Sequence, residues 1–118
     1  MRRPLILLWN DAWIDVEAAR RNSRQHCRIS TDRADFEQAD AVIFPVPTTG
    51  VRLPPERANR RQVWAMWSQE CVVHFPIIEH PEYLRRFDLT MTYRLDSDVP
   101  IPYLDADTFD ELPPLVTL

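Results

Sequence analysis

The chain has 118 residues, 45% of them hydrophobic, and a formal net charge of −4, which fits one domain with a buried core. No basic run exceeds two residues, so neither the charge balance nor its pattern indicates a nucleic-acid-binding surface. The chain has one glycine, Gly50, and no lysine. These absences exclude a P-loop and a dinucleotide fingerprint, because both need several glycines where the backbone approaches phosphate.

The cysteine content and the first apolar run bear on the cellular location. Cys27 and Cys71 form neither a metal-binding pattern nor a disulfide framework. The run Leu5–Trp9 is too short for a signal peptide or a membrane span. We therefore expect a soluble, cytoplasmic protein without a membrane span, in which any peripheral membrane contact uses regions outside this sequence.

The first part of the chain is predicted to alternate strands and helices. Leu5–Trp9 is an unbroken apolar run, typical of a strand covered on both faces. Asn10 or Asp11 is a suitable N-cap for a helix of about Ala12–Arg24, with Trp13 facing the sheet. A short strand, a helix capped by Thr31 or Asp32 and a third strand are then expected over Cys27–Ser30, residues 31–38 and Ala41–Phe44.

The second part continues the same alternation after a loop. A helical turn is expected at Glu56–Arg60, a buried strand at Val63–Trp67, a helix at Pro81–Arg86 and a strand at Leu89–Tyr93. From Asp98 onward the chain is acidic and rich in proline, which indicates an exit linker or edge segment.

Five strands alternating with helices predict βαβ units and therefore a parallel sheet. We expect an α/β fold with a five-stranded flavodoxin-like or Rossmann-like sheet, strand order 2-1-3-4-5 and flanking helices. Ligands of such sheets bind at the carboxyl ends of the strands. Residues at or just after the predicted strand ends are Trp9, Asn10, Glu70, Arg94, Asp96 and Asp98.

Several stretches resemble the α-1,3/4-fucosyltransferase family, whose members read W-x-x-x-E-S-P-S-H/N, then F-N/D-x-T-M/L-S/T-Y-R-x-D-S-D, then P-Y-G. The segment from Thr92 to Asp98 keeps T-Y-R-x-D-S-D intact, and Glu70 and His74 keep the E-x-x-x-H spacing. The chain departs from the pattern in three places: Cys71-Val72 replaces Ser-Pro, Leu104 replaces the last glycine, and Pro45-Val46 replaces a His-His pair. Further similar stretches are Leu5–Trp9, Cys27–Ile29, Thr31–Arg33, Ala39–Phe44, Trp64–Glu70, Phe87–Asp98 and Pro102-Tyr103.

This resemblance covers nearly the whole chain but only about the first third of a typical member. It implies the N-terminal, acceptor-side half of a two-domain GT-B-type glycosyltransferase of bacterial type. Residues 1–104 would form the acceptor-side domain and residues 105–118 an exit segment toward a donor domain. The implied partners are a glycan acceptor with N-acetylglucosamine or glucose and the C-terminal donor domain of the same enzyme. The donor would be GDP-fucose, transferred with inversion, and this chain itself would hold no cofactor.

Glu70 and His74 each have two interpretations. By position, Glu70 is either a solvated loop acid or a general base that takes the proton of an acceptor hydroxyl. The resemblance implies the base. His74, in an apolar stretch, is either a structural hydrogen-bonding residue or a contact to sugar.

The aromatic residues after the first strand also have two interpretations. Trp9 and Trp13, with Asn10 between them, either face the crevice and stack on a sugar or pack in the core. For Trp64 and Trp67 core packing is the better prediction.

Asp96-Ser97-Asp98 matches the D-x-D pattern of metal-dependent glycosyltransferases. The other interpretation is that these side chains cap backbone amides in a turn after the fifth strand. The family that the chain resembles does not use this triplet to bind metal, so we expect no metal site. Tyr93, Arg94, Asp96 and Asp98 are then candidate acceptor contacts, with Arg94 pairing to one of the two aspartates.

Three other classes of protein compete with this interpretation. A phospho-receiver domain needs an Asp after the third strand and a Lys after the fifth, and this chain has Pro45 and no lysine. A flavodoxin needs a phosphate loop rich in Ser, Thr and Gly after the first strand, which Asn10–Trp13 is not. A stand-alone, non-catalytic module that binds sugar or a protein partner stays open.

Overall fold

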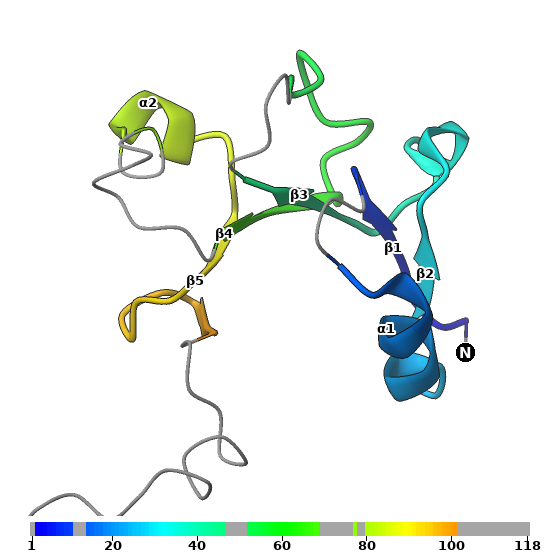
Figure 1. Ribbon diagram of the computed structural model, residues 1–118. Coiled ribbons are helices and arrows are strands. Elements are labelled where there is room, and N and C mark those ends of the chain that lie inside the picture. The colour runs from blue at the N-terminus through cyan, green and yellow to red at the C-terminus, as the bar shows by residue number, and fades with distance from the viewer. Residues whose placement is uncertain (1, 11–13, 47–51, 69–76, 78–79, 102–118) are drawn as a thin grey trace, which may run out of the picture.

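The computed structural model describes residues 2–10, 14–46, 52–68, 77 and 80–101. These residues form an α/β arrangement built on one parallel sheet (Figure 1). The strands are β1 (Leu5–Leu8), β2 (Arg28–Ser30), β3 (Ala41–Pro45), β4 (Val63–Ser68), β5 (Leu89–Thr92) and β6 (Val99–Pro100). The helices are α1 (Val16–Ser23), the short 3-10 helix η1 (Arg33–Asp35) and α2 (Pro81–Leu84).

The sheet has the order β2-β1-β3-β4-β5-β6, and every neighbouring pair is parallel. The predicted order 2-1-3-4-5 is confirmed, but the prediction of five strands is wrong because β6 adds a sixth. Only six residues, Tyr93–Asp98, connect β5 to β6, whereas parallel crossovers usually take about a dozen or more. β6 is two residues long and exposed, and it contains a proline, so no apolar run marks it in the sequence.

The core lies on one face of the sheet. Because side chains alternate along a strand, every second residue of β1, β3 and β4 points to this face. The 52–62 segment, η1 and α2 cover it. The buried cluster consists of Leu7, Ala39, Val42, Phe44, Val46, Trp64, Met66 and Phe87, with Trp9, Phe36, Leu53, Tyr83 and Leu84 packed against it.

The buried amide of Gln62 joins three parts of this face. Gln62 is only 2% exposed, and its Oε1 accepts from the backbone N–H of Ala58 at 3.1 Å and from Trp64 Nε1 at 2.9 Å. Its Nε2 donates to the carbonyls of Phe36 at 2.7 Å and Ala39 at 3.1 Å. All four hydrogen-bonding positions of the amide are therefore used.

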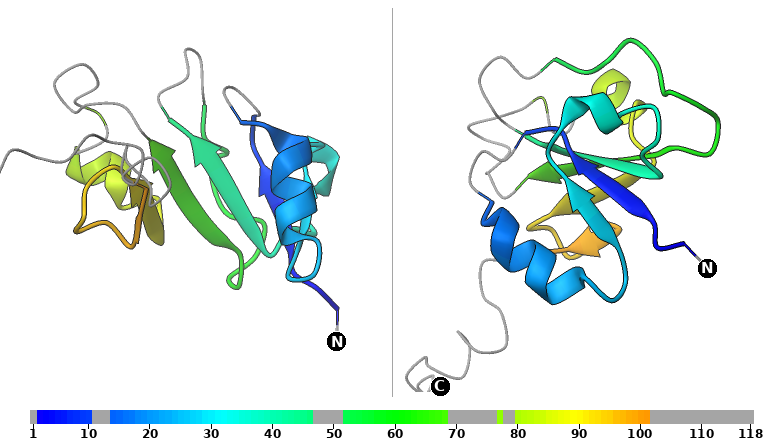
Figure 2. Two further views of the ribbon diagram at one scale, coloured as in Figure 1. Left: turned by 60° about the horizontal axis from the view of Figure 1, so that its bottom comes forward. Right: turned by 90° about the vertical axis from the view of Figure 1, so that its right-hand side faces the viewer.

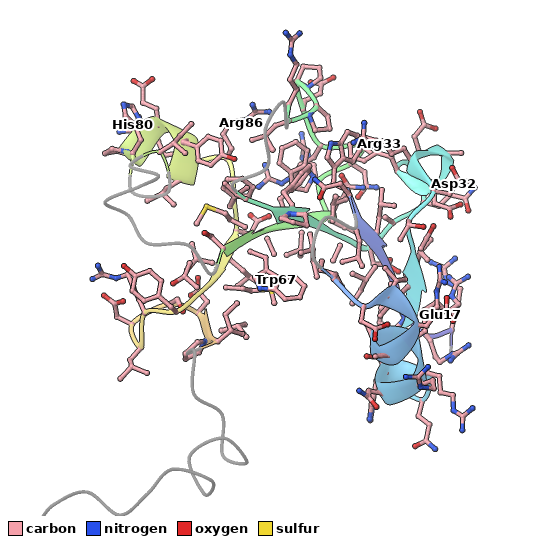
Figure 3. The ribbon with its side chains drawn as sticks, in the orientation of Figure 1. Glu17, Asp32, Arg33, Trp67, His80 and Arg86 are labelled. Carbon is pink, nitrogen blue, oxygen red and sulfur yellow. The ribbon has the colours of Figure 1, made fainter. Side chains whose placement is uncertain are left out.

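The opposite face is covered by α1 at its β2 end (Figure 1). The helix begins at Val16 rather than near Ala12, because Asp15 is the N-cap and accepts from the backbone N–H of Ala18 at 3.0 Å. The prediction of Asn10 or Asp11 as the cap is therefore wrong. Trp67 points to this face and is half-buried (Figure 3), so it is not the fully packed core residue that Trp64 is.

The other predicted helices are shorter than expected. Asp32 caps its helix as predicted, accepting from the backbone N–H of Ala34 at 2.9 Å. The turn is 3-10, and a hydrogen bond from Ser30 Oγ to Asp35 at 2.6 Å holds it against β2. α2 ends at Leu84, and residues 56–60 form turns without a helix.

One arrangement recurs at three strand starts. An aspartate directly before a strand accepts the backbone N–H of the neighbouring strand: Asp40 from Leu5 at 2.7 Å, Asp88 from Trp64 at 2.8 Å, and Asp98 from Thr90 at 2.9 Å. Each carboxylate provides a hydrogen-bond acceptor for an amide N–H that lies just before the first paired residues of the two strands. The same device thus fixes the register of β1 with β3, β4 with β5, and β5 with β6.

Candidate functional site

The carboxyl ends of β4 and β5 lie side by side. Ser68, the last residue of β4, is fully buried and pairs with Thr92, the last residue of β5. The chain therefore leaves β4 toward Glu70 directly beside the start of the T-Y-R-x-D-S-D segment. Glu70 and His74 themselves lie outside the described residues, so their roles stay predictions.

The segment Thr92–Asp98 is a compact loop that its own polar groups hold together. Thr92 Oγ1 accepts from the backbone N–H of Arg94 at 3.2 Å. The single O–H of Ser97 has two carbonyl acceptors in reach, that of Arg94 at 2.8 Å and that of Thr92 at 3.3 Å. These short-range bonds explain why this segment uses Thr and Ser, whose hydroxyls bond to nearby backbone.

Arg94 and Asp96 form a bidentate pair across the tip of this loop. Nε of Arg94 lies 2.9 Å from Oδ1 of Asp96, and NH2 lies 3.0 Å from Oδ2. The predicted pairing of Arg94 with one of the two aspartates is thereby confirmed, with Asp96 as the partner. The hydrogen bond from Arg94 lowers the pKa of the Asp96 carboxyl from its ordinary value, aided by the positive charge of the guanidinium. Asp96 is therefore ionised at neutral pH.

Asp98 binds elsewhere. Its Oδ2 accepts from the backbone N–H of Thr90 at 2.9 Å and from Thr90 Oγ1 at 3.2 Å. Because Asp98 precedes β6, it lies beside the start of β5 and not at its carboxyl end. The two aspartates thus have different partners, and capping of a backbone amide is what Asp98 does in this structure.

A cavity of about 450 Å³ opens beside these groups. It is lined by Met66 and Leu84 on the apolar side. The polar side consists of Thr90, Thr92, Arg94, Asp96 and Ser97. Its volume and its combination of apolar wall and converging polar groups are those of a small-molecule site.

Trp9 follows β1 at the same carboxyl edge, and its ring is in contact with protein. Its ring centroid lies 5.7 Å from that of Phe36 and 5.5 Å from that of Phe44. The guanidinium of Arg33 lies over the ring at 4.2 Å, and its Nε donates to the Trp9 carbonyl at 3.1 Å (Figure 3). Trp9 is therefore a half-buried packing residue, with Arg33 on the ring where a sugar would stack.

Asn10 is half-buried beside Trp9, and its Oδ1 is a buried atom without a hydrogen-bond partner among the described residues. Trp13 lies outside the described residues. Tyr93 is half-buried at the start of the loop. The structure thus brings Arg94 and Asp96 to one cavity and leaves Trp9 and Asn10 at a different strand end.

The chemistry available at the cavity is hydrogen bonding to hydroxyl groups. An ionised carboxylate, a guanidinium and three hydroxyls provide acceptors and donors within one space. Within the described part of the chain, no three His, Cys, Asp or Glu side chains gather in a way that would hold a metal ion.

Sequence reasoning did not select several lining residues. Thr90 and Ser97 lie in the quoted segment, but their role depends on how the loop folds back on β5. Met66 and Leu84 were expected only as core or helix residues, because whether they border a cavity depends on where α2 lies. Arg33 carries no signal for its contact with Trp9, which is 24 positions away along the chain.

Comparison with known proteins places this chain in a family. Residues 1–104 match the model of the fucosyltransferase N-terminal domain. Relatives include the chimpanzee 3-galactosyl-N-acetylglucosaminide 4-alpha-L-fucosyltransferase FUT3, 38% identical over 109 residues, and the gorilla 4-galactosyl-N-acetylglucosaminide 3-alpha-L-fucosyltransferase FUT6, 34% identical over 109 residues. A third is the mouse 4-galactosyl-N-acetylglucosaminide 3-alpha-L-fucosyltransferase 9, 33% identical over 82 residues.

The chain belongs to the fucosyltransferase family, through that family's N-terminal domain. The three alignments cover 84%, 85% and 67% of this chain. They cover 28%, 30% and 22% of the respective relatives, so the chain spans less than a third of each. Within the described residues, no helix is both long and apolar enough to span a membrane.

Proposed function

We propose that this chain is the acceptor-binding domain of an α-1,3-fucosyltransferase. The whole protein would transfer fucose from GDP-fucose to an N-acetylglucosamine or glucose hydroxyl of a glycan, with inversion. The observation that carries this proposal is the cavity between β4, β5 and α2, because five of its seven lining residues come from the stretch Phe87–Asp98 that resembles the family motif: Thr90, Thr92, Arg94, Asp96 and Ser97.

The cavity supplies what an acceptor sugar needs. Paired Arg94 and Asp96 offer donors and an acceptor, and the half-buried Thr90 offers a hydroxyl. The half-buried Leu84 offers apolar surface for a sugar face. Because Arg94 and Asp96 already hold each other, little side-chain entropy is lost when an acceptor binds them.

In the proposed mechanism Glu70 takes the proton of the attacking hydroxyl. A sugar hydroxyl is a weak nucleophile at neutral pH, and a positioned base contributes about 10²–10⁴-fold in rate. Glu70 follows Ser68 by two residues, and Ser68 is paired with Thr92 at the cavity edge. The donor and its diphosphate would be held by a C-terminal domain in a GT-B-type arrangement, with the present sheet as its Rossmann-like N-terminal half.

Kinetics of the full-length enzyme test this proposal. Glu70→Gln keeps the shape and removes the basicity, so kcat should fall at least about 100-fold with the fold intact. Glu82→Gln, which changes an exposed acid on α2, is the matched control and should leave kcat unchanged. If Glu70→Gln keeps its rate while Asp96→Asn or Asp98→Asn loses it, Glu70 is not the base and the proposed assignment is wrong.

A non-catalytic module that binds sugar is the second candidate, favoured because the groups that line the cavity can bind a sugar by hydrogen bonds alone. NMR titration with an N-acetylglucosamine-containing glycan should perturb Arg94 and Ser97 under either function. Only the enzyme shows transfer by the full-length protein, so that assay separates the two.

A further inference from the structure

All strands run in the same direction, so their amino ends form one edge, opposite the carboxyl edge that holds the candidate site (Figure 2). Three Arg-Arg pairs precede strands: Arg2-Arg3 before β1, Arg60-Arg61 before β4 and Arg85-Arg86 before β5. Arg28 begins β2. We call the six exposed members of this set the arginine edge: Arg2, Arg3, Arg28, Arg60, Arg61 and Arg85.

Cavities along this edge are lined by arginines in groups. One of about 430 Å³ is lined by Arg2, Arg60 and Arg61 among others. A second of about 470 Å³ shares Arg60 and adds two arginines that the fold itself uses, Arg57 and Arg86. A third of about 200 Å³, near β2, is lined by Arg3, Arg20, Arg24 and Arg28. Positive charge therefore extends along the edge instead of meeting at one point.

The inner arginines are structural. Arg57 pairs with Asp88 at 2.8 Å and lies 5.1 Å from the Trp64 ring centroid. Arg86 lies over the same ring at 5.5 Å and donates to the carbonyl of Pro54 (Figure 3). These two hold the 52–62 segment on the sheet, so they are not counted in the arginine edge.

The acids at this edge are mostly engaged within the fold. Asp88 binds Arg57 and the Trp64 amide, and Asp40 binds the Leu5 amide with Arg2 at 3.8 Å. Asp98, before β6, accepts from Thr90. Glu56, which lines the second cavity, is a further exposed acid nearby. Arg60 and Arg61 are exposed, and neither belongs to an ion pair within the described part of the chain.

We propose that the arginine edge is a docking surface for anionic lipid headgroups, which would place a peripheral membrane contact within this sequence, whereas the sequence alone predicts any such contact outside it. From β2 to β5 the edge crosses four strand spacings, roughly 19 Å, which is too long for one phosphate and suits a row of them. Arginine binds phosphate through two parallel N–H donors. Docking by this edge leaves the candidate site on the side of the sheet away from the lipid.

A nucleic acid is the competing polyanion. Non-specific binding to single strands uses exposed aromatic side chains as stacking platforms. Trp64, the tryptophan beside these arginines, is 1% exposed, which favours lipid. The net charge of −4 does not prevent docking, because exposed charges more than about 10 Å apart are largely screened at 0.1 M salt.

Co-sedimentation of the full chain with vesicles tests the proposal. Binding is expected to vesicles of phosphatidylcholine with phosphatidylglycerol, to be absent with phosphatidylcholine alone, and to weaken from about 0.05 M to about 0.5 M salt. Arg60→Gln/Arg61→Gln should reduce affinity at least about tenfold, and so should Arg2→Gln/Arg3→Gln. Thermal unfolding checks that each variant is folded.

The matched control is Arg33→Gln/Arg94→Gln. It removes the same two charges from residues that follow the carboxyl ends of β2 and β5, so it should bind vesicles within about twofold of the parent. An equal loss of vesicle affinity in the control would show that binding depends only on the net charge of the chain, and it would overturn the proposal. So would the absence of binding to anionic vesicles, or tighter binding to an RNA or DNA oligomer at the same salt concentration, which would assign the edge to nucleic acid.

Discussion

At the scale of single residues, Gln62 illustrates how a buried polar group organises an apolar core. Its amide bonds to the 52–62 segment, to the connection before β3 and to the indole of Trp64. Removing a buried amide with four partners costs far more stability than removing an exposed one. Its former partners would stay buried, away from water and without a hydrogen bond.

Gln62→Leu should therefore lower the free energy of unfolding by about 2–4 kcal/mol, since it leaves Trp64 Nε1 and the Ala58 amide without an acceptor. Urea denaturation of the chain measures this. Gln38→Leu, an exposed glutamine, is the control and should change stability by no more than about 0.5 kcal/mol. Equal effects of the two substitutions would show that the network contributes nothing specific.

Asp96 gives a prediction about pH. Because Arg94 lowers the pKa of Asp96 in the folded chain, the pairing is present above the ordinary aspartate pKa and is lost as pH falls through the lowered value. An NMR titration of the Asp96 carboxyl carbon should give a midpoint below the ordinary range for an aspartate. Arg94→Gln should return the midpoint to the ordinary range. A midpoint unchanged by that substitution would mean that the pair does not persist in solution.

At the scale of elements, β6 depends on the aspartate that precedes it. Asp98 ties β6 to Thr90, and the backbone N–H of Ile101 donates to the Thr92 carbonyl at 2.8 Å just beyond the strand. A strand of two exposed residues has little apolar contact of its own, so these polar bonds decide whether it stays on the sheet.

Asp98→Ala should accordingly speed hydrogen exchange at the Ile101 amide, at a cost to stability of about 1 kcal/mol. Asp96→Ala is the comparison, because Asp96 pairs with Arg94 and not with β5. Asp98 would not be the residue that holds β6 on the sheet if exchange at Ile101 became faster in Asp96→Ala, or stayed unchanged in Asp98→Ala.

Sequence patterns were informative for buried strands and less so elsewhere. β1, β3 and β4 come from apolar runs, because strands covered on both faces need apolar residues at consecutive positions. β5, with the sequence LTMT, instead alternates apolar and polar residues and is only partly buried. β6 has no such run, and α1 has its cap at Asp15 because local hydrogen bonds, not periodicity, decide where a helix begins. The Arg94–Asp96 pair was foreseen since both residues lie in one short loop. The Trp9–Arg33 contact was not, because it joins residues 24 positions apart.

At the scale of the whole molecule, the parallel sheet separates two kinds of surface. Arg-Arg pairs that are far apart in the sequence gather at the amino edge, and a sequence scan for basic runs misses them since no run exceeds two residues. The carboxyl edge holds the candidate acceptor cavity. The proposed acceptor and the proposed lipid therefore approach from opposite ends of the strands, and neither blocks the other.

This separation bears on the donor. Diphosphates are usually held by glycine-rich turns or lysines at the carboxyl edge, and the chain has one glycine and no lysine. We therefore expect the chain to bind GDP-fucose only in the millimolar range or weaker, through contact of the diphosphate with the arginine edge, and not to transfer fucose by itself.

Calorimetry with GDP-fucose checks the expected weak binding in two steps. Whatever binding is seen at low salt should disappear at high salt and in Arg60→Gln/Arg61→Gln, because exposed charge pairs are screened and that variant removes two of them. Arg33→Gln/Arg94→Gln should leave the signal unchanged. A dissociation constant in the low micromolar range that persists at high salt would place a donor site within these 118 residues. The proposed division of acceptor and donor between two domains would then be wrong, whereas the family membership, which rests on residues 1–104, would stand.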